Sequence, residues 1–265
     1  MSRLLEVCCG NLESVEAAVK GGAKRIELCS ALELDGLTPS AEDLRTVKAR
    51  YPELTVHVLI RSRAGDFHYT QEEIKTMAGE VEDALEAGAD GIVIGCLDKN
   101  GDPDIKALLE LIRPVEDWNL AQELTASDLC HASNDGHFFP GAPRKAVSLT
   151  FHRAFDAIRD PFFALEALAS LGFDRILTSG QAASAETGIP LLKSLVERAA
   201  GRVIILPGGG VSPENAARIL SETGAAEIHA SASEMINGQK VTSKDKVSAI
   251  LSSINQSRGD CLRAV

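Results

Sequence analysis

Short apolar runs alternate with amphipathic stretches along most of this chain. A run such as TVHVLI at residues 55–60 is rich in β-branched residues and has the length of a buried strand. The stretches between such runs carry helix start signals, for example Thr70 with Glu73 three residues later, the spacing of a capping box. The pattern predicts eight strands, each followed by a helix, at residues 4–9, 25–29, 55–60, 90–94, 147–152, 174–178, 202–206 and 227–230.

A repeated glycine signal supports this alternation. Four segments read alike: GGAKRIEL from Gly21, AGADGIVI from Ala87, LGFDRILT from Leu171 and TGAAEIHA from Thr223. In each of them a glycine is expected to end a helix in a left-handed conformation, just before the next strand begins. Four copies of a strand–helix–strand–helix unit favour an α/β fold, a closed (β/α)8 TIM barrel that forms a single domain over residues 1–265. An open, doubly wound sheet is the alternative.

Two regions depart from the alternation. Residues 116–146 are polar, contain the turn signals NDG and PGAP, and predict a surface insertion between the fourth helix and the fifth strand. This insertion contains Cys130, His131 and His137, but their spacing is not that of a zinc site. Residues 232–265 predict a C-terminal helix followed by a polar tail.

Composition and charge argue against several classes of partner. The formal net charge is −11 and only 4% of the residues are aromatic, which argues against binding to nucleic acid or to an anionic membrane surface. No apolar run approaches the roughly 20 residues of a membrane span, and the N-terminus lacks the apolar region of a signal peptide. The six cysteines do not have the spacing of a disulfide framework. We therefore expect a cytoplasmic protein with reduced thiols.

Polar side chains gather at the ends of the predicted strands, where (β/α)8 barrels carry their active sites. Side chains alternate between the two faces of a strand, so Glu6 shares a face with Cys8, and Glu27 shares a face with Cys29. The same rule turns polar residues of the third, fifth and eighth strands toward the barrel axis. The resulting candidates for a catalytic pocket are Glu6, Glu27, Arg61, His152, Arg153 and His229.

These charges allow two interpretations. They can form an ion-paired structural layer, for instance through Glu27 and Arg61, because buried charges are costly unless they are paired. They can instead form a pocket for a polar ligand, and we prefer this interpretation because several strands contribute at the same end. His152 is then the candidate general acid or base. Arg61 and Arg153 would bind an anion.

A glycine run follows the seventh predicted strand, in the segment PGGGVSP. Glycines allow backbone N–H groups to approach a ligand closely, and the loops after strands seven and eight of barrels commonly hold phosphate. Gly208, Gly209, Gly210 and Ser231 are therefore candidates for a phosphate or anion loop, and a simple tight turn is the alternative.

Cys8 and Cys29 are candidates for a metal site. They lie on neighbouring parallel strands, which are about 4.8 Å apart, and two thiolates at that separation can bind a soft metal such as Cu(I). The nearby carboxylates would attract the cation but would also oppose ionisation of the thiols. The alternative is that both cysteines are small, buried core residues.

The order of several motifs resembles that of a known family. From Leu5 to Ala232 these motifs read LEVC, GGAKRIELCSALELDGLTPS, IRSRAGDF, TFHRAFD, DRILTSGQ, PGGG and HASA. They resemble the CutC family of copper homeostasis proteins over nearly the whole chain apart from the insertion and the tail. The resemblance implies a (β/α)8 barrel that is often a dimer, and Cu(I) binding at cysteines that match Cys8 and Cys29. We therefore expect a homodimer.

Two functions follow from these observations. The first is a cytoplasmic protein of copper homeostasis that binds Cu(I) through the two cysteines. The alternative is a TIM-barrel enzyme that acts on a small anionic metabolite, with phosphorylated compounds favoured by the glycine run. The sequence does not decide whether the chain is an enzyme, and the expected partner is a copper ion or a small anionic ligand.

Overall fold

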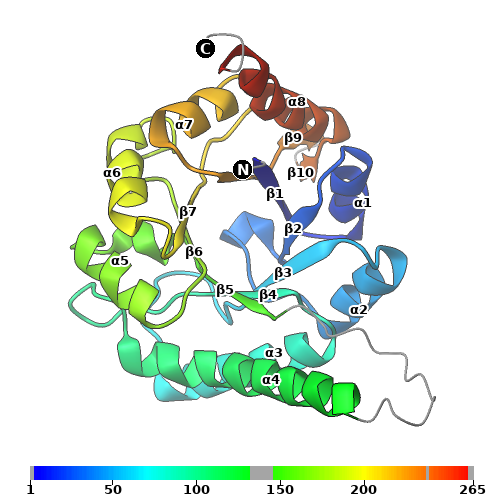
Figure 1. Ribbon diagram of the computed structural model, residues 1–265, viewed down its shortest axis with the longest axis vertical. Helices are drawn as coiled ribbons and strands as arrows, with labels where there is room; N and C mark the ends of the chain where they lie inside the picture. Colours follow the sequence, from blue (N-terminus) through cyan, green and yellow to red (C-terminus); the bar gives the residue numbers. More distant parts are fainter. Residues whose placement is uncertain (1–2, 132–145, 237–238, 262–265) are drawn as a thin grey trace.

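Eight parallel strands curve around a common centre, and helices surround them (Figure 1). The structure is a computed structural model that describes residues 3–131, 146–236 and 239–261. The strands of the barrel are β1 (Leu4–Cys9), β2 (Arg25–Leu28), β3 (Thr55–Leu59), β4 (Gly91–Ile94), β5 (Ser148–Phe151), β6 (Arg175–Thr178), β7 (Ile204–Pro207) and β8 (Glu227–Ala230).

The order of the strands confirms the predicted barrel. The hydrogen-bonded sheet runs β7-β6-β5-β4-β3-β2-β1-β8, so that strands consecutive in the sequence are neighbours and β8 returns to pair with β1. The two ends of this order, β7 and β8, lie side by side, which nearly closes the barrel. A doubly wound sheet would instead reverse direction near its middle, and that alternative is wrong.

The helices connect successive strands and cover the outside of the barrel. Asn11 caps the first of them by accepting a hydrogen bond from the backbone of Ser14 at 2.8 Å, and Thr70 and Glu73 form the predicted capping box. The helices are α1 (Leu12–Lys20), α2 (Ala41–Arg50), α3 (Gln71–Glu86), α4 (Ile105–His131), α5 (Pro161–Ser170), α6 (Ile189–Ala199), α7 (Ala216–Thr223) and α8 (Lys244–Cys261). Short 3-10 helices lie at Leu32–Leu34 (η1) and Arg153–Ala157 (η3).

The four repeated glycines have the backbone conformation that the sequence predicts. Gly22, Gly88, Gly172 and Gly224 all have positive φ angles, between 78° and 99°. Each one follows a helix and precedes an even-numbered strand. The fourfold repeat in the sequence is therefore a repeat of the turn that directs the chain from a helix back into the sheet.

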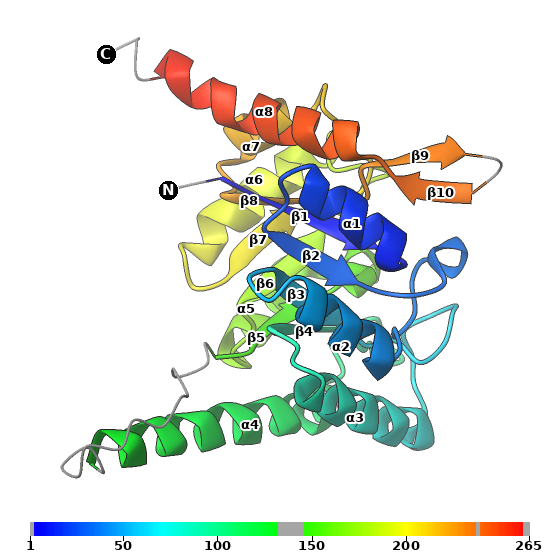
Figure 2. The same cartoon turned by 90° about the vertical axis from the view of Figure 1, so that its right-hand side faces the viewer.

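The fourth helix is longer than the sequence suggested. α4 continues through Pro114 to His131, so the N-terminal part of the predicted 116–146 insertion is helical. Buried apolar residues such as Leu111 and Val115 continue its apolar stripe, and α4 packs along α3. Figure 2 shows its C-terminal end at the side of the barrel where the strands begin. Cys130 and His131 end this helix, and His137 lies outside the described residues.

A hairpin that was not predicted precedes the last helix. β9 (Ser233–Ile236) pairs with β10 (Gln239–Thr242) in an antiparallel ladder, directly after β8. Figure 2 shows the hairpin extending from the end of the barrel where the strands finish. The 232–265 region thus contributes both a hairpin and the expected helix.

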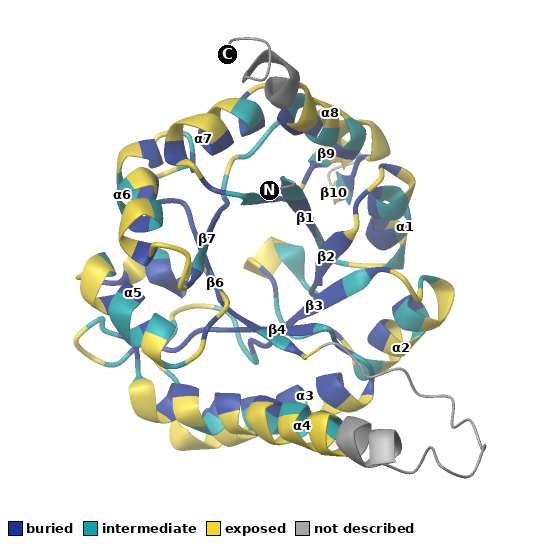
Figure 3. Cartoon of the chain, in the orientation of Figure 1, coloured by how far each residue is buried: buried dark blue, intermediate teal, exposed yellow. Residues whose placement is uncertain are grey.

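Alternation along the strands separates the apolar core from the barrel interior. Leu5 and Val7 of β1 belong to the main core cluster between strands and helices, with exposures of 1% and 0%. Glu6 and Cys8 of the same strand point the other way, toward the barrel axis. Exposed residues gather on the outer faces of the helices (Figure 3). Among the helices of the described chain, none combines the length and the apolar composition needed to cross a membrane.

Candidate functional site

A cavity of about 520 Å³ lies at the carboxyl ends of the strands. Its walls come from β1, β2, β3, β6 and β8 and from the loops that follow β2, β3 and β5. A volume of this size is typical of sites for small molecules. Six residues that the sequence identified as candidates line it: Cys8, Glu27, Arg61, His152, Arg153 and His229.

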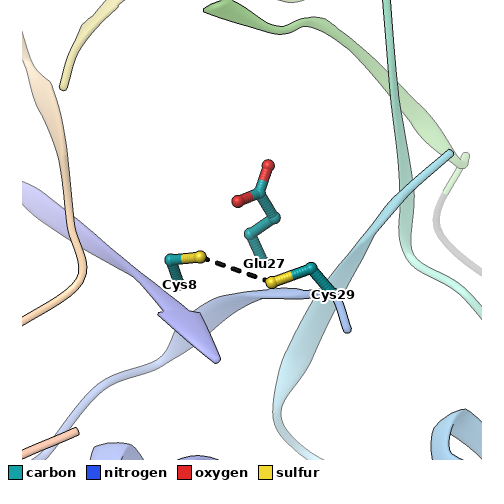
Figure 4. A group of neighbouring side chains, drawn as sticks. All are labelled: Cys8, Glu27 and Cys29. Atoms are coloured by element: carbon teal, nitrogen blue, oxygen red, sulfur yellow. Dashed lines mark hydrogen bonds between the residues drawn. The ribbon is translucent and has the colours of Figure 1, made fainter. Parts of the chain in front are cut away.

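Two thiols and a carboxylate form a compact group at one side of this cavity. The Sγ atoms of Cys8 and Cys29 are 3.5 Å apart, and one ligand atom from each of Cys8, Glu27 and Cys29 lies within 4.8 Å of the others (Figure 4). The register of the sheet causes this proximity, because Cys8 is paired with Glu27 across β1 and β2. The sequence predicted carboxylates near the two cysteines, but only Cys8 and Cys29 were named as candidate metal ligands.

The Cys8 thiol of this group resists ionisation. The hydrogen bond with Cys29, burial and the charge of Glu27 together raise the pKa of the Cys8 thiol well above its ordinary value. Burial, together with the charge of Glu6, raises the pKa of Glu27 as well. A cation that binds here must therefore displace thiol protons, and it would relieve the repulsion among these groups.

Glu6 lies behind the cavity and pairs with three cationic or titratable groups. Its carboxylate is 2.6 Å from Nε of Arg25, 2.9 Å from Nδ1 of His57 and 2.9 Å from Nδ1 of His229. Burial acts to raise the pKa of Glu6, but Arg25 and the two histidines outweigh it and hold the pKa well below its ordinary value. Glu6 is therefore an ionised anchor for its neighbours and does not line the cavity.

The ion pairs continue from Glu6 into a buried layer. Arg25 also contacts Glu227, whose second cationic partner is Arg175 at 2.8 Å. This is the structural layer that the sequence offered as an alternative to a pocket, although it does not use the suggested pair of Glu27 and Arg61. The molecule contains both the layer and the cavity, and the layer lies on the side of the strand starts.

His229 links the ion-pair layer around Glu6 to the cluster of Cys8, Glu27 and Cys29. Its Nδ1 contacts Glu6, and its Nε2 lies 3.7 Å from Oε2 of Glu27. Burial lowers the pKa of His229, but contacts with Cys8 and Glu6 and the charge of Glu27 outweigh burial and raise it well above the ordinary value. The imidazole therefore favours the protonated form in this acidic surrounding.

Arg61 holds two loops together. Its guanidinium donates to the carbonyl oxygens of Leu34 and Gly36 at 3.0 Å each, and to that of Gly65 at 2.9 Å. These bonds join the loop after β2 to the loop after β3. Most of the N–H groups that were predicted to bind an anion are thus directed to backbone carbonyls.

His152 is held as a neutral hydrogen-bond donor. Its Nδ1 accepts a hydrogen bond from the backbone N–H of Ala154 at 3.1 Å, so the ring proton resides on Nε2. Burial and the charge of Arg61 lower its pKa to about 3. The ring of Phe67 lies 5.0 Å away, centroid to centroid. At neutral pH this geometry suits donation of a hydrogen bond rather than the acid–base role expected from the sequence.

Arg153 is fixed on one side only. Its Nε donates to Asp156 at 2.8 Å and its Nη2 to the hydroxyl of Ser179 at 3.3 Å, while the side chain remains 47% exposed. Asp156, which the sequence analysis did not select, also accepts from the hydroxyl of Thr178 and from the backbone of Gln181. Its position three residues after Arg153 is the feature of the sequence from which this ion pair could have been predicted.

The predicted anion loop does not line the main cavity, whose wall residues include none of Gly208, Gly209, Gly210 and Ser231. Gly209 and Gly210 have φ angles of 95° and 69°, and a Cβ atom on Gly209 would lie 3.4 Å from the Arg153 guanidinium. Ser231 instead lines a separate cavity of about 250 Å³, together with Glu214 and Lys246. The loop at Gly209 lies close to the cationic side chain of Arg153.

Gly208 allows the same loop to approach the main cavity. A Cβ atom at this position would lie 2.6 Å from Leu177 and 3.3 Å from His229, both of which line the cavity. Any larger residue would therefore push the loop away from the cavity wall. The requirement for glycine here is steric rather than a direct contact with an anion.

Comparison with known proteins identifies the family. The pattern of the CutC family matches residues 3–134 and 142–234. A family protein CutC from Bacteroides thetaiotaomicron is 42% identical over 243 residues, which cover 92% of this chain and 86% of that protein. The copper homeostasis protein cutC homolog of Homo sapiens is 41% identical over 229 residues, which cover 86% of this chain and 73% of that protein.

Solved structures agree with this result. A CutC structure from Streptococcus agalactiae has a TM-score of 0.73 at 30% identity and covers 86% of this chain and 98% of that chain. Phosphoribosyl anthranilate isomerase from Thermotoga maritima, at 13% identity and a TM-score of 0.53, covers 97% of this chain and 100% of its own and shows the shared barrel fold alone. Because the family pattern and relatives above 40% identity span most of the barrel, this chain belongs to the CutC family.

Proposed function

We propose that this protein binds Cu(I) through Cys8 and Cys29. The observation that supports this function best is the 3.5 Å separation of the two Sγ atoms at the wall of a cavity. Thiolates are soft ligands that select Cu(I) over harder cations. Mammalian relatives that share 41% of their residues with this chain are named copper homeostasis proteins, in agreement with this chemistry.

Glu27 would assist the two thiols electrostatically. Its carboxylate is the third member of the compact group, and its negative charge would favour a cation at this position. Thiol protons leave when the metal binds, so the elevated pKa of Cys8 makes Cu(I) affinity increase with pH. Burial of Cys29 limits the access of water to the bound ion.

Anaerobic titration with Cu(I) in the presence of a competing chelator tests this function. We expect the double change Cys8→Ser and Cys29→Ser to weaken Cu(I) binding by more than about 100-fold, above the range for loss of an outer-shell partner. Cys9→Ala is the matched control, because Cys9 belongs to the apolar core on the opposite face of β1. Unchanged affinity in the double variant would show that the metal binds elsewhere or not at all.

The cavity supports a second candidate function, an enzyme that acts on a small anionic metabolite. Its volume of about 520 Å³ exceeds what a single metal ion needs, and it lies where barrel enzymes have their active sites. Turnover of phosphorylated and carboxylated metabolites by the metal-free protein tests this candidate. The homodimer, the cytoplasmic location and the lack of nucleic-acid and membrane partners stay predictions.

A further inference from the structure

The cavity has two chemically different sides. β1, β2 and β8 supply Cys8, Glu27 and His229, and the loop after β2 adds Asp35. Across the barrel, the segment that directly follows β5 contributes His152, Arg153 and Asp156 to the lining. In the closed order of eight strands β5 lies four positions from β1, so these two groups of residues face each other.

The polar side chains that line the cavity at β3 and β5 are mainly hydrogen-bond donors. Arg61, His152 and Arg153 line it, and the one carboxylate among them, Asp156, is already bonded to Arg153 and to several other donors. A ligand group that faces this side would therefore have to be an acceptor.

His152 has an unused donor on this side. The ring is 4% exposed and borders the cavity, and among the described residues its Nε2 has no hydrogen-bond partner. The hydrogen bond at Nδ1 fixes the tautomer, so the unpartnered nitrogen carries the proton. A buried donor without a partner is unfavourable, and a ligand oxygen would satisfy it.

Arg61 adds an uncompensated charge to this side. Its guanidinium is bonded to three backbone carbonyls, and among the ion pairs of the described residues none involves Arg61. Asp156 balances Arg153 but not Arg61. A 5% exposed arginine without an anionic partner attracts a negative charge into the space beside it.

We propose that the β5 side of the cavity is a binding subsite for the oxyanion of a small hydroxylated metabolite, either a phosphate or a carboxylate group. Nε2–H of His152 and the exposed part of the Arg153 guanidinium donate to the oxyanion. The hydroxylated end of the molecule extends toward Glu27 and His229. This inference rests on the second candidate function, and the donors that it assigns to the oxyanion, His152 and Arg153, do not belong to the proposed copper group.

Glycine at position 209 gives the arginine its place in this subsite. A side chain there would contact the guanidinium, with a Cβ atom 3.4 Å from its Cζ and Nη1. Glycine therefore leaves Nη1 without a side-chain neighbour at this position, while Nε and Nη2 of Arg153 donate to Asp156 and Ser179.

Calorimetric titration of the full-length, metal-free protein tests the subsite with three related probes. Glycerol 3-phosphate and glycerate carry the two oxyanions, and glycerol carries neither. We expect at least one of the anions to bind and glycerol not to bind. The preferred anion then distinguishes a phosphate site from a carboxylate site.

Two variants locate the binding. Arg153→Leu should weaken the anion at least tenfold, and it leaves Asp156 bonded to Thr178 and Ser179. The matched control is Arg159→Leu, since Arg159 is 69% exposed and pairs with Asp102 outside the cavity. A second readout needs no variant: the ¹⁵N signal of Nε2 in His152 should shift when the anion binds.

The outcomes separate the subsite from the candidate function. If neither anion binds, or if glycerol binds as well as they do, the subsite is overturned. If an anion binds wild type and Arg153→Leu equally and leaves the His152 signal unmoved, the subsite is also overturned, while a metabolite-binding function survives. Tenfold weaker binding in Arg153→Leu alone, together with the shifted signal, supports it.

Discussion

His152 shows at the scale of one residue how the fold changes a side chain's chemistry. Its ordinary pKa near neutrality suggested an acid or base, but the structure buries the ring beside the charge of Arg61. The hydrogen bond from its own loop, at Ala154, then fixes the tautomer. The result is a hydrogen-bond donor that is neutral at neutral pH.

The lowered pKa predicts an acid-dependent loss of stability. The pKa is about 3 in the folded protein against an ordinary 6.5, so between these values the unfolded chain binds an extra proton. The contribution of neutral His152 to the free energy of unfolding is complete above pH 6.5 and is lost as the pH falls toward 3. We expect this residue to cost about 2 kcal/mol of unfolding free energy between pH 7 and pH 5.

Urea unfolding at both pH values checks this expectation. The reference is His152→Asn, whose side chain can still accept the hydrogen bond from Ala154 but does not titrate. Other groups titrate equally in both proteins, so the difference between them isolates His152. An equal loss of stability in wild type and variant would contradict the assigned pKa.

Among the secondary-structure elements and their loops, the loop after β2 packs over the cluster of Cys8, Glu27 and Cys29. Ser30 and Leu37 form an antiparallel bridge at its base, and Gly36 has a φ of 88°. A Cβ atom on Gly36 would lie 3.7 Å from Cβ of Cys29, so the loop packs directly on that cysteine. Arg61, which follows the neighbouring strand β3, donates hydrogen bonds to two carbonyl oxygens of this loop.

Removing the hydrogen bonds of Arg61 should make the loop after β2 more mobile without unfolding the barrel. In Arg61→Leu the carbonyls of Leu34 and Gly36 lose their donor, and we expect amide hydrogen exchange in residues 30–38 to accelerate at least tenfold. Arg63→Leu is the control, because Arg63 binds within its own loop and α3 rather than to residues 30–38. Unchanged exchange in Arg61→Leu would mean that packing alone holds the loop.

For the whole molecule, Glu6 joins the beginning and the end of the chain. It lies on β1, and its three partners lie on β2, β3 and β8. This one carboxylate therefore connects four strands of the barrel, including the pair that brings the last strand to the first. Its burial makes the interaction strong and its loss costly.

The variant Glu6→Gln tests this role. Gln keeps the size of the side chain but leaves Arg25 and the histidines without the negative charge, so we expect the free energy of unfolding to fall by about 3–5 kcal/mol. Chemical denaturation followed by circular dichroism measures it. Glu166→Gln, at an exposed ion pair on the surface, should show no measurable change. A similar stability for both variants would refute the anchoring role.

The repeat of strands and helices, and the direction of the side chains along each strand, could be predicted from the sequence alone. Strand alternation placed Glu6, Cys8 and Glu27 inside the barrel, and the glycine signals set the number of elements, because both depend on local backbone geometry. The sequence pattern predicted too early an end for α4. The helix continues beyond Pro114 because its apolar stripe packs against α3.

Which charged residues pair with one another depends on the tertiary structure. Glu27 joins the cysteines through the register of β1 and β2, and Arg61 turns to backbone carbonyls instead of to Glu27. These outcomes depend on distances between residues far apart in the sequence, which alternation alone does not fix. The side-chain periodicity is a local property of a strand, whereas the partners, the pKa values and the cavity come from the closure of the barrel.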